Sequence, residues 1–135
     1  MIIHTPIGFV PKGDPTRKKV IFEEKKKILN LPHADKYFIM KDMDIEYVDG
    51  IRRMIAFLDK NEKYGALALW PYVAPIQKEH HDHISSQFVM IRSEAVTTFD
   101  LNWSKKCFCQ HLCDYLRFYG WEIKYFSKGK IINHG

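Results

Sequence analysis

The sequence predicts an α+β fold, a ferredoxin-like sandwich in which two helices pack on one face of a mainly antiparallel sheet. Two observations lead to this fold class. The chain has 135 residues, of which 46% are hydrophobic, which is enough for one core and too few for two domains. From residue 36 onward, segments with strand or helix spacing follow in the order strand, helix, strand, strand, strand, helix, strand. That order is βαββαβ with one added strand.

Residues 1–35 are predicted to form a basic, irregular N-terminal arm with one short helix or strand. Prolines and glycines interrupt residues 6–15. Residues 17–30 combine a short apolar run with a charged block, and Pro32 ends whichever element they form. The rest of the chain, residues 36–135, is expected to be a single α+β domain.

The first strand and the first helix of that domain follow from its apolar pattern. Residues 36–41 form a compact apolar run that is typical of a buried strand. Residues 44–63 are predicted to form a helix capped by Asp44, since apolar residues recur every three or four positions. The dipeptide Asp49-Gly50 offers a competing hairpin turn, but the alternation that a hairpin needs is missing after it.

The second half of the domain is predicted to hold four more strands and a helix. The strands are expected over 66–73, 87–91, 95–101 and 121–126, and the helix over 104–119. The tail after residue 126 is expected to fray. Four apolar residues on the two helices are expected in the core: Ile55, Leu58, Leu112 and Leu116.

Basic side chains concentrate in the first quarter of the chain. The formal net charge is +5, and residues 1–36 hold eight basic and four acidic side chains. A basic segment with irregular backbone attracts phosphate-bearing partners, so Lys12, Arg17, Lys18 and Lys19 are candidate ligand-binding residues. The alternative is a solvated, lysine-rich surface that keeps the protein soluble.

Aromatic side chains near the ends of the predicted elements are further candidates for ligand binding. Trp70 and Tyr72 lie at the end of the second strand, and Trp103 and Trp121 flank the last helix. Such rings stack on nucleic-acid bases or on an adenine ring. The alternative is packing in the core or at a sheet edge.

The densest polar cluster in the sequence is Glu79-His80-His81-Asp82-His83. On an extended chain His81 and His83 would face one divalent transition metal, such as zinc or manganese. No other cofactor is expected. The pair is similar to the His-x-His motif of rolling-circle replication initiators, although Asp82 stands where those proteins have a hydrophobic residue. A histidine-rich surface loop without a metal is the alternative.

Three cysteines lie within seven residues of each other, with His111 among them. On a helix that begins at Ser104, Cys107 and Cys109 would point to nearly opposite sides, so the cluster would not converge on one metal. Cys109 and Cys113 are therefore expected in the core. An odd, local set of cysteines also argues against a disulfide framework and for a reducing, cytoplasmic location.

The motifs of several enzyme classes are missing from the sequence. It has no glycine-rich phosphate loop, no G-x-S-x-G and no H-E-x-x-H, which excludes P-loop NTPases, α/β-hydrolases and zincin proteases. In layout, the region from Lys36 looks like phage-type S-adenosylmethionine lyases: a strand, a helix ending at Tyr64-Gly65, a strand, then VTTFDLN, a helix and a closing strand. The resemblance implies a small oligomeric enzyme on an adenosyl or nucleotide substrate, although those lyases carry a carboxylate on the strand that here reads ALALW.

A second resemblance concerns the C-terminal part of the chain. From Ser93 to Tyr125 the layout is similar to that of bacterial S-adenosylmethionine decarboxylases. That family needs a Glu-Ser pair, whereas this chain has Ser93-Glu94, so decarboxylase activity is not expected.

The favoured hypothesis is a small binding protein for a phosphate-bearing partner, either nucleic acid or a nucleotide-like small molecule. The lyase-like enzyme and an accessory protein that blocks a protein partner are the alternatives. A homo-oligomer is expected with the enzyme alternative, because one chain does not show a complete catalytic site. No membrane partner is expected, since the longest apolar run, residues 66–76, is too short to span a bilayer. The first residues also lack the basic region of a signal peptide.

Overall fold

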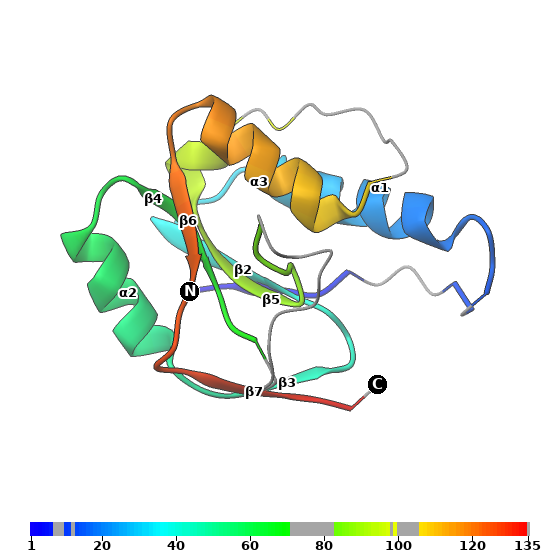
Figure 1. The fold of residues 1–135 in the computed structure, drawn as a ribbon, viewed down its shortest axis with the longest axis horizontal. Coiled ribbons are helices and arrows are strands. Elements are labelled where there is room, and N and C mark those ends of the chain that lie inside the picture. The colour runs from blue at the N-terminus through cyan, green and yellow to red at the C-terminus, as the bar shows by residue number, and fades with distance from the viewer. Residues whose placement is uncertain (7–9, 12, 71–82, 98, 100–105, 135) are drawn as a thin grey trace.

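The computed structural model describes residues 1–6, 10–11, 13–70, 83–97, 99 and 106–134 (Figure 1). Within them lie three α-helices: α1 (Arg17–Leu29), α2 (Ile51–Lys60) and α3 (Phe108–Phe118). A short 3-10 helix, η2, covers Ser93–Val96. The strands are β1 (Ile3–His4), β2 (Tyr37–Lys41), β3 (Ile45–Asp49), β4 (Tyr64–Ala68), β5 (Phe88–Arg92), β6 (Glu122–Tyr125) and β7 (Lys130–Asn133).

Five strands form one mixed sheet in the order β1-β2-β5-β4-β6, and β3 and β7 form a separate two-stranded ribbon. β1 is parallel to β2, and β6 is parallel to β4, whereas β5 is antiparallel to both of its neighbours. The strands β1, β2, β4 and β6 therefore point in one direction and β5 in the other. The predicted mixed α+β class is confirmed. The ferredoxin-like layout is not confirmed, because the sheet has a parallel part.

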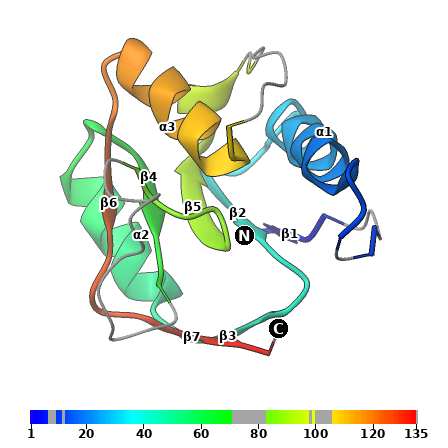
Figure 2. The same cartoon turned by 45° about the vertical axis from the view of Figure 1, so that its right-hand side comes forward.

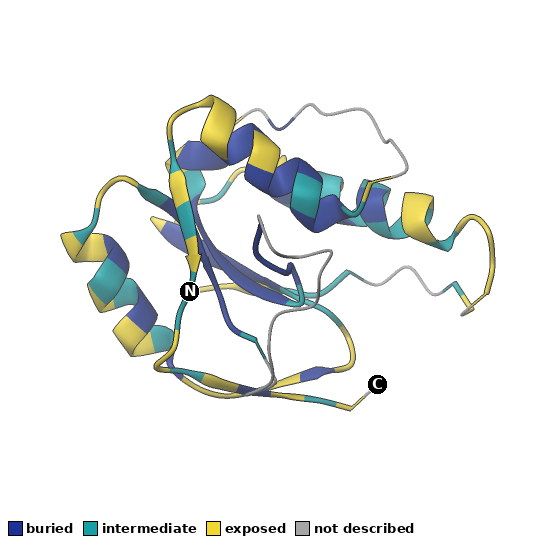
Figure 3. Cartoon of the chain, in the orientation of Figure 1, coloured by how far each residue is buried: buried dark blue, intermediate teal, exposed yellow. Residues whose placement is uncertain are grey.

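Both faces of the sheet are covered, as Figures 2 and 3 show. Phe38 and Met40 of β2 pack with α1 and α3, whereas the alternate residues Tyr37 and Ile39 pack with α2 and the β3–β7 ribbon. The prediction that both later helices share one face is therefore corrected, since α2 and α3 lie on opposite faces. Because the central strands β2, β4 and β5 are buried at nearly every position, each face needs a cover of its own.

The predicted helix over residues 44–63 is a strand followed by a helix. Residues 45–49 form β3, which pairs with β7 near the C-terminus, so the tail is ordered rather than frayed. Gly50 then makes the turn into α2 with a φ of 120°, a conformation that favours glycine. The apolar spacing in this region does not distinguish a helix from a strand that pairs with a distant partner.

The other predicted elements are present with shifted boundaries. β4, β5 and β6 overlap the predicted strands, and α3 covers all but the first four residues and the last residue of the predicted helix. The strand predicted from residue 95 is not formed at its start, because Ala95 and Val96 end η2 and are buried there. Of the predicted core residues, Leu58, Leu112 and Leu116 are buried and Ile55 is partly buried.

The N-terminal region adds an edge strand and a helix to the same sheet. β1 pairs with β2, and α1 buries Phe22 and Leu29 in the core that it shares with α3. Both residues lie on one stripe of the helix, seven positions apart. None of the described helices combines the length and the apolar composition that a membrane span requires.

Candidate functional site

The carboxyl ends of β1, β2, β4 and β6 lie along one edge of the sheet, which we call the carboxyl edge (Figure 1). Asp42 follows β2 there, and its backbone N–H donates a hydrogen bond to the Gln87 carbonyl at 2.9 Å. Phe126 follows β6, and its N–H donates to the Ala68 carbonyl at 2.8 Å. In open sheets with parallel strands, ligands bind outside this edge. The carboxyl edge is therefore the first candidate location for a ligand-binding site.

The helix α3 begins at the carboxyl edge, and α1 begins on the same side of the sheet, about 12 Å beyond Lys25, which contacts this edge. Cys107, the N-cap of α3, contacts His83, which precedes β5, whereas the other end of the helix leads to the start of β6. Lys25 in α1 reaches Asp42, whereas His33, which follows α1, stacks on Phe38 near the start of β2. The positive ends of two helix dipoles therefore lie on this side of the sheet.

An ion pair between the buried Lys25 and the partly exposed Asp42 links α1 to the carboxyl edge. Lys25 is 4% exposed, and its Nζ lies 2.8 Å from an oxygen of Asp42 and donates to the Ser86 hydroxyl at 2.8 Å. The ammonium also lies 5.6 Å from the centre of the Phe108 ring at the start of α3. One lysine thus joins α1, the end of β2, the start of β5 and α3. Removal of either charged partner would leave the other poorly compensated.

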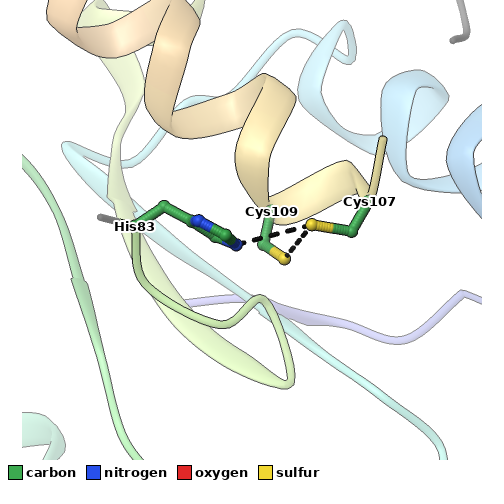
Figure 4. A group of neighbouring side chains, drawn as sticks. All are labelled: His83, Cys107 and Cys109. Atoms are coloured by element: carbon green, nitrogen blue, oxygen red, sulfur yellow. Dashed lines mark hydrogen bonds between the residues drawn. The ribbon is translucent and has the colours of Figure 1, made fainter. Parts of the chain in front are cut away.

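A histidine and two cysteines meet beside this pair (Figure 4). The Cys107 Sγ lies 3.4 Å from the His83 Nε2, and the Cys109 thiol donates a hydrogen bond to the Cys107 Sγ at 3.0 Å. His83 and Cys109 are buried, and Cys107 is half-buried. We call His83, Cys107 and Cys109 the His-Cys-Cys cluster.

The environment separates the pKa values of the two cysteines. The pKa of Cys107 is lowered to about 5, because the Cys109 thiol donates it a hydrogen bond, and the Gln110 backbone N–H and the His83 imidazole also favour the thiolate. The pKa of Cys109 is raised by the same hydrogen bond and by burial, and the charge of Lys25 opposes this rise only in part. These contacts favour the thiolate form of Cys107, which is the form that binds metals and attacks electrophiles.

The helix begins later than the sequence predicts, and this is why the two cysteines converge. Cys107 is not inside α3 but at its N-cap, with extended backbone angles of φ −69° and ψ 155°. The expectation that Cys107 and Cys109 point to opposite sides applies to a helix that starts at residue 104 and is wrong here. Cys113 lies deeper in the core, as expected, and burial raises its pKa to about 12.

Three of the four predicted basic residues, Arg17, Lys18 and Lys19, lie in the first turn of α1. Arg17 donates to the Val10 carbonyl at 2.7 Å, and Lys18 and Lys19 are exposed. Lys12 lies outside the described residues. Sequence reasoning did not single out Lys25, although its spacing from Phe22 and Leu29 on the apolar stripe of α1 would have indicated that it is buried.

The predicted aromatic and metal-binding residues are placed only in part. Trp70 follows β4 at the carboxyl edge, half-buried, with its ring edge-on to Tyr125 at 5.7 Å. His83 belongs to the His-Cys-Cys cluster. Tyr72 and His81 lie outside the described residues. The structure therefore joins one of the two predicted metal ligands to Cys107 and Cys109, which were not expected to converge on one metal. Cys109 is also buried, as expected.

A surface hollow of about 650 Å³ lies at the opposite edge, where β2 begins and β5 ends. It is lined by residues 30–36 and by part of the segment 93–97, and its charged side chains are Asp35, Lys36 and Glu94. Carboxylates outnumber the single ammonium among these described lining residues. The hollow is therefore poorly suited to a phosphate group, and the carboxyl edge is the better candidate.

Comparison with known proteins does not identify a family. No protein-family model matches the chain, and no curated protein matches it. Among solved structures, it is similar to a protein from Bacillus anthracis that is named a glucose-1-phosphate thymidylyltransferase, in complex with a sucrose. The identity is 15% and the TM-score is 0.48, and the match covers 86% of this chain and 54% of that one. The chain thus spans about half the length of that protein, and the likeness is too distant to indicate an activity.

Proposed function

We propose that the protein binds a phosphate-bearing small molecule, nucleotide-like in character, at the carboxyl edge of its sheet. One observation carries the proposal: four strands end at this edge, α3 begins there, and α1 begins on the same side of the sheet, beyond the edge. The first N–H groups of a helix have no partner inside the helix, and its dipole favours negative charge. Two such termini above the carboxyl ends of parallel strands are suited to phosphate oxygens.

The charges in the first turn of α1 support a phosphate ligand. Arg17, Lys18 and Lys19 occupy this turn, which holds no acidic residue. Cations at the positive end of a helix dipole are unfavourable in isolation. The Asp14 carboxylate, which accepts a hydrogen bond from the Thr16 backbone N–H at 2.8 Å, offsets one of the three positive charges, and a bound anion would offset the others. Lys18 is exposed and stands one turn before Phe22, on the stripe of α1 that faces the sheet, so it is available to a ligand that extends from the carboxyl edge towards the start of α1.

Trp70 supports a ligand that also carries a base. It is half-buried at the end of β4, close to Tyr125, which is on the same edge. An indole in this position offers a stacking surface for a heterocycle whose phosphates lie at the helix termini. The arrangement would hold the two ends of a nucleotide on opposite sides of the edge.

A small molecule is favoured over nucleic acid because the cations of α1 are not a continuous surface. Lys25 is buried with Asp42, and the Lys27 Nζ lies 3.5 Å from a Glu24 oxygen. Glu23 and Glu24 thus interrupt the basic residues in the middle of the helix. A polyanion that follows the helix would meet these carboxylates, whereas a ligand confined to the first turn would not.

Isothermal titration of the full chain with nucleoside diphosphates tests the proposal. Lys18→Ala is expected to weaken binding by about 10-fold or more, since a hydrogen bond to a charged group contributes roughly 1.5–3 kcal/mol. Lys27→Ala is the matched control: it removes an exposed lysine from the same helix at the opposite end and is expected to leave the affinity unchanged. Trp70→Leu is expected to weaken nucleotide binding while it spares the weaker binding of inorganic pyrophosphate.

Other outcomes of the titration would favour one of the alternative functions. Equal losses in the Lys18 and Lys27 variants, with a steep salt dependence and tighter binding of oligonucleotides, would replace the proposal by nucleic-acid binding. No binding of either class would favour the partner-blocking alternative. Turnover of a bound nucleotide, followed by mass spectrometry, would favour the enzyme, and sedimentation velocity would then test the expected homo-oligomer.

A further inference from the structure

We propose that His83, Cys107 and Cys109 form a binding site for a zinc ion at the start of α3. The proposal goes beyond nucleotide binding and does not rest on it. Among the described residues, these three side chains each offer one ligand atom, and all three atoms lie within 4.8 Å of one another (Figure 4). The atoms are the Nε2 of His83 and the Sγ atoms of Cys107 and Cys109.

The distances are close to those of a tetrahedral zinc site. With Zn–S bonds of about 2.3 Å and Zn–N bonds of about 2.0–2.1 Å, ligand atoms lie about 3.8 Å apart for two sulfurs and about 3.6 Å apart for sulfur and nitrogen. The Cys107 Sγ and the His83 Nε2 are 3.4 Å apart, and the two sulfurs are 3.0 Å apart. The sulfurs need to separate by less than 1 Å, which rotation about the side-chain torsions provides.

The backbone that carries the ligands is fixed by packing. Cys107 and Cys109 stand on either side of Phe108, whose ring lies 5.5 Å from that of Phe22 in α1. His83 is 4% exposed and is followed by Ile84, which belongs to the same core as α3. The three ligands therefore come from two segments that the core already holds together, so the site is preorganised rather than assembled by the metal.

The donor set selects the metal. Two sulfurs and one imidazole nitrogen suit zinc and are poor ligands for magnesium or calcium, which prefer oxygen. Two thiolates would balance the charge of one Zn²⁺ ion. With three ligands from these residues, a fourth position is left for water or an added ligand, as in zinc sites that bind substrates.

Metal titration of the full chain under reducing conditions tests this site. Protein freed of metal by a chelator is titrated with Zn²⁺ in competition with a chromophoric chelator, and a 1:1 complex is expected. Cys107→Ser and His83→Asn are each expected to weaken Zn²⁺ binding by more than about 100-fold, since loss of an outer-shell partner already costs 10–100-fold. Cys113→Ala is the matched control, because this cysteine lies on the same helix outside the cluster, and it is expected to keep the full affinity.

Cobalt provides a measurement that does not depend on the folding of a variant. Co²⁺ added to the metal-free wild type is expected to give the intense near-ultraviolet charge-transfer band of thiolate ligands. Absence of a 1:1 complex would overturn the proposal, as would Zn²⁺ or Co²⁺ bound without this band. Full affinity in Cys107→Ser, or loss of affinity in Cys113→Ala alone, would also overturn it.

Discussion

His4, the last residue of β1, lies against aromatic rings. Its ring lies 5.5 Å from that of His33 and 6.0 Å from that of Phe38, and its Nε2 is buried with no hydrogen-bond partner among the described residues. Burial, followed by the charge of His33, lowers its pKa below the ordinary value of 6.5. The folded state therefore disfavours protonation at this position.

We predict that this histidine makes the protein less stable in mild acid. As pH falls below about 6.5, the unfolded chain takes up a proton at His4 before the folded chain does, so the free energy of unfolding decreases until pH has passed the lowered pKa of the folded state. Denaturant unfolding at pH 7.5 and 5.5 measures the decrease. In His4→Phe this decrease in the free energy of unfolding is expected to be smaller. An unchanged pH dependence in that variant would contradict the prediction.

At the scale of residues, the sequence identifies chemical types better than partners. His83 and the cysteines stand out by type, but the contact between them depends on where α3 begins and on which segments meet at the carboxyl edge. Lys25 sits in a block of charged residues that reads as a solvated surface, and only its tertiary contacts with Asp42 and Ser86 make it a buried cation. Local spacing does not contain this information.

At the scale of elements, α3 offers a direct test of the core. Leu112 is 1% exposed and packs between α1 and the sheet, whereas Phe118 on the same helix is 82% exposed. Leu112→Ala is expected to reduce the free energy of unfolding by about 2–5 kcal/mol, because it removes buried methyl groups and leaves a cavity. Phe118→Ala is expected to change it by no more than about 0.5 kcal/mol. Similar effects of the two changes in urea titrations would place the helix outside the core.

A second test compares two glycines that have a positive φ: Gly50, in the turn between β3 and α2, and Gly120, which follows α3. A Cβ added to Gly50 would lie 2.6 Å from the Cα of Gly129, whereas one added to Gly120 would have no heavy atom within 4 Å. Gly120→Ala is expected to cost roughly 1 kcal/mol for the unfavourable φ alone. Gly50→Ala is expected to cost more, because the backbone of the β3–β7 ribbon must also move. Equal melting temperatures for the two variants would show that the ribbon does not pack against this turn.

The β3–β7 ribbon shows why some elements are predicted from the sequence and others are not. The strands β2, β4 and β5 are buried apolar runs, and α3 has an apolar face, so local patterns are sufficient for them. β3 differs, because its partner β7 lies more than 80 residues away, and its apolar spacing also fits a helix. Pairing with β7 decides between the two, and pairing over such a separation is not visible in a local window.

At the scale of the whole molecule, the burial of the strands on both faces of the sheet determines how the layers are arranged. Every position of β5 is buried, so each face of the sheet requires a cover, and the three helices and the ribbon divide between the two faces. Sequence order alone does not reveal that β1 joins β2 in parallel or that β6 joins β4. Because of these parallel pairs, four strands run in the same direction, and their carboxyl ends together form the carboxyl edge on which the proposed function depends.

The central claim is that a nucleotide-like ligand binds at this edge rather than at the hollow on the opposite side. Backbone amide NMR of labelled protein, recorded while a nucleoside diphosphate is added, tests it most directly. The predicted result is that shifts concentrate at Lys18, Trp70 and the first turn of α3, with Cys107 and Gln110 among the most affected. Shifts concentrated at residues 30–36 and 93–97, which line the hollow, would contradict the claim, as would a spectrum that does not change.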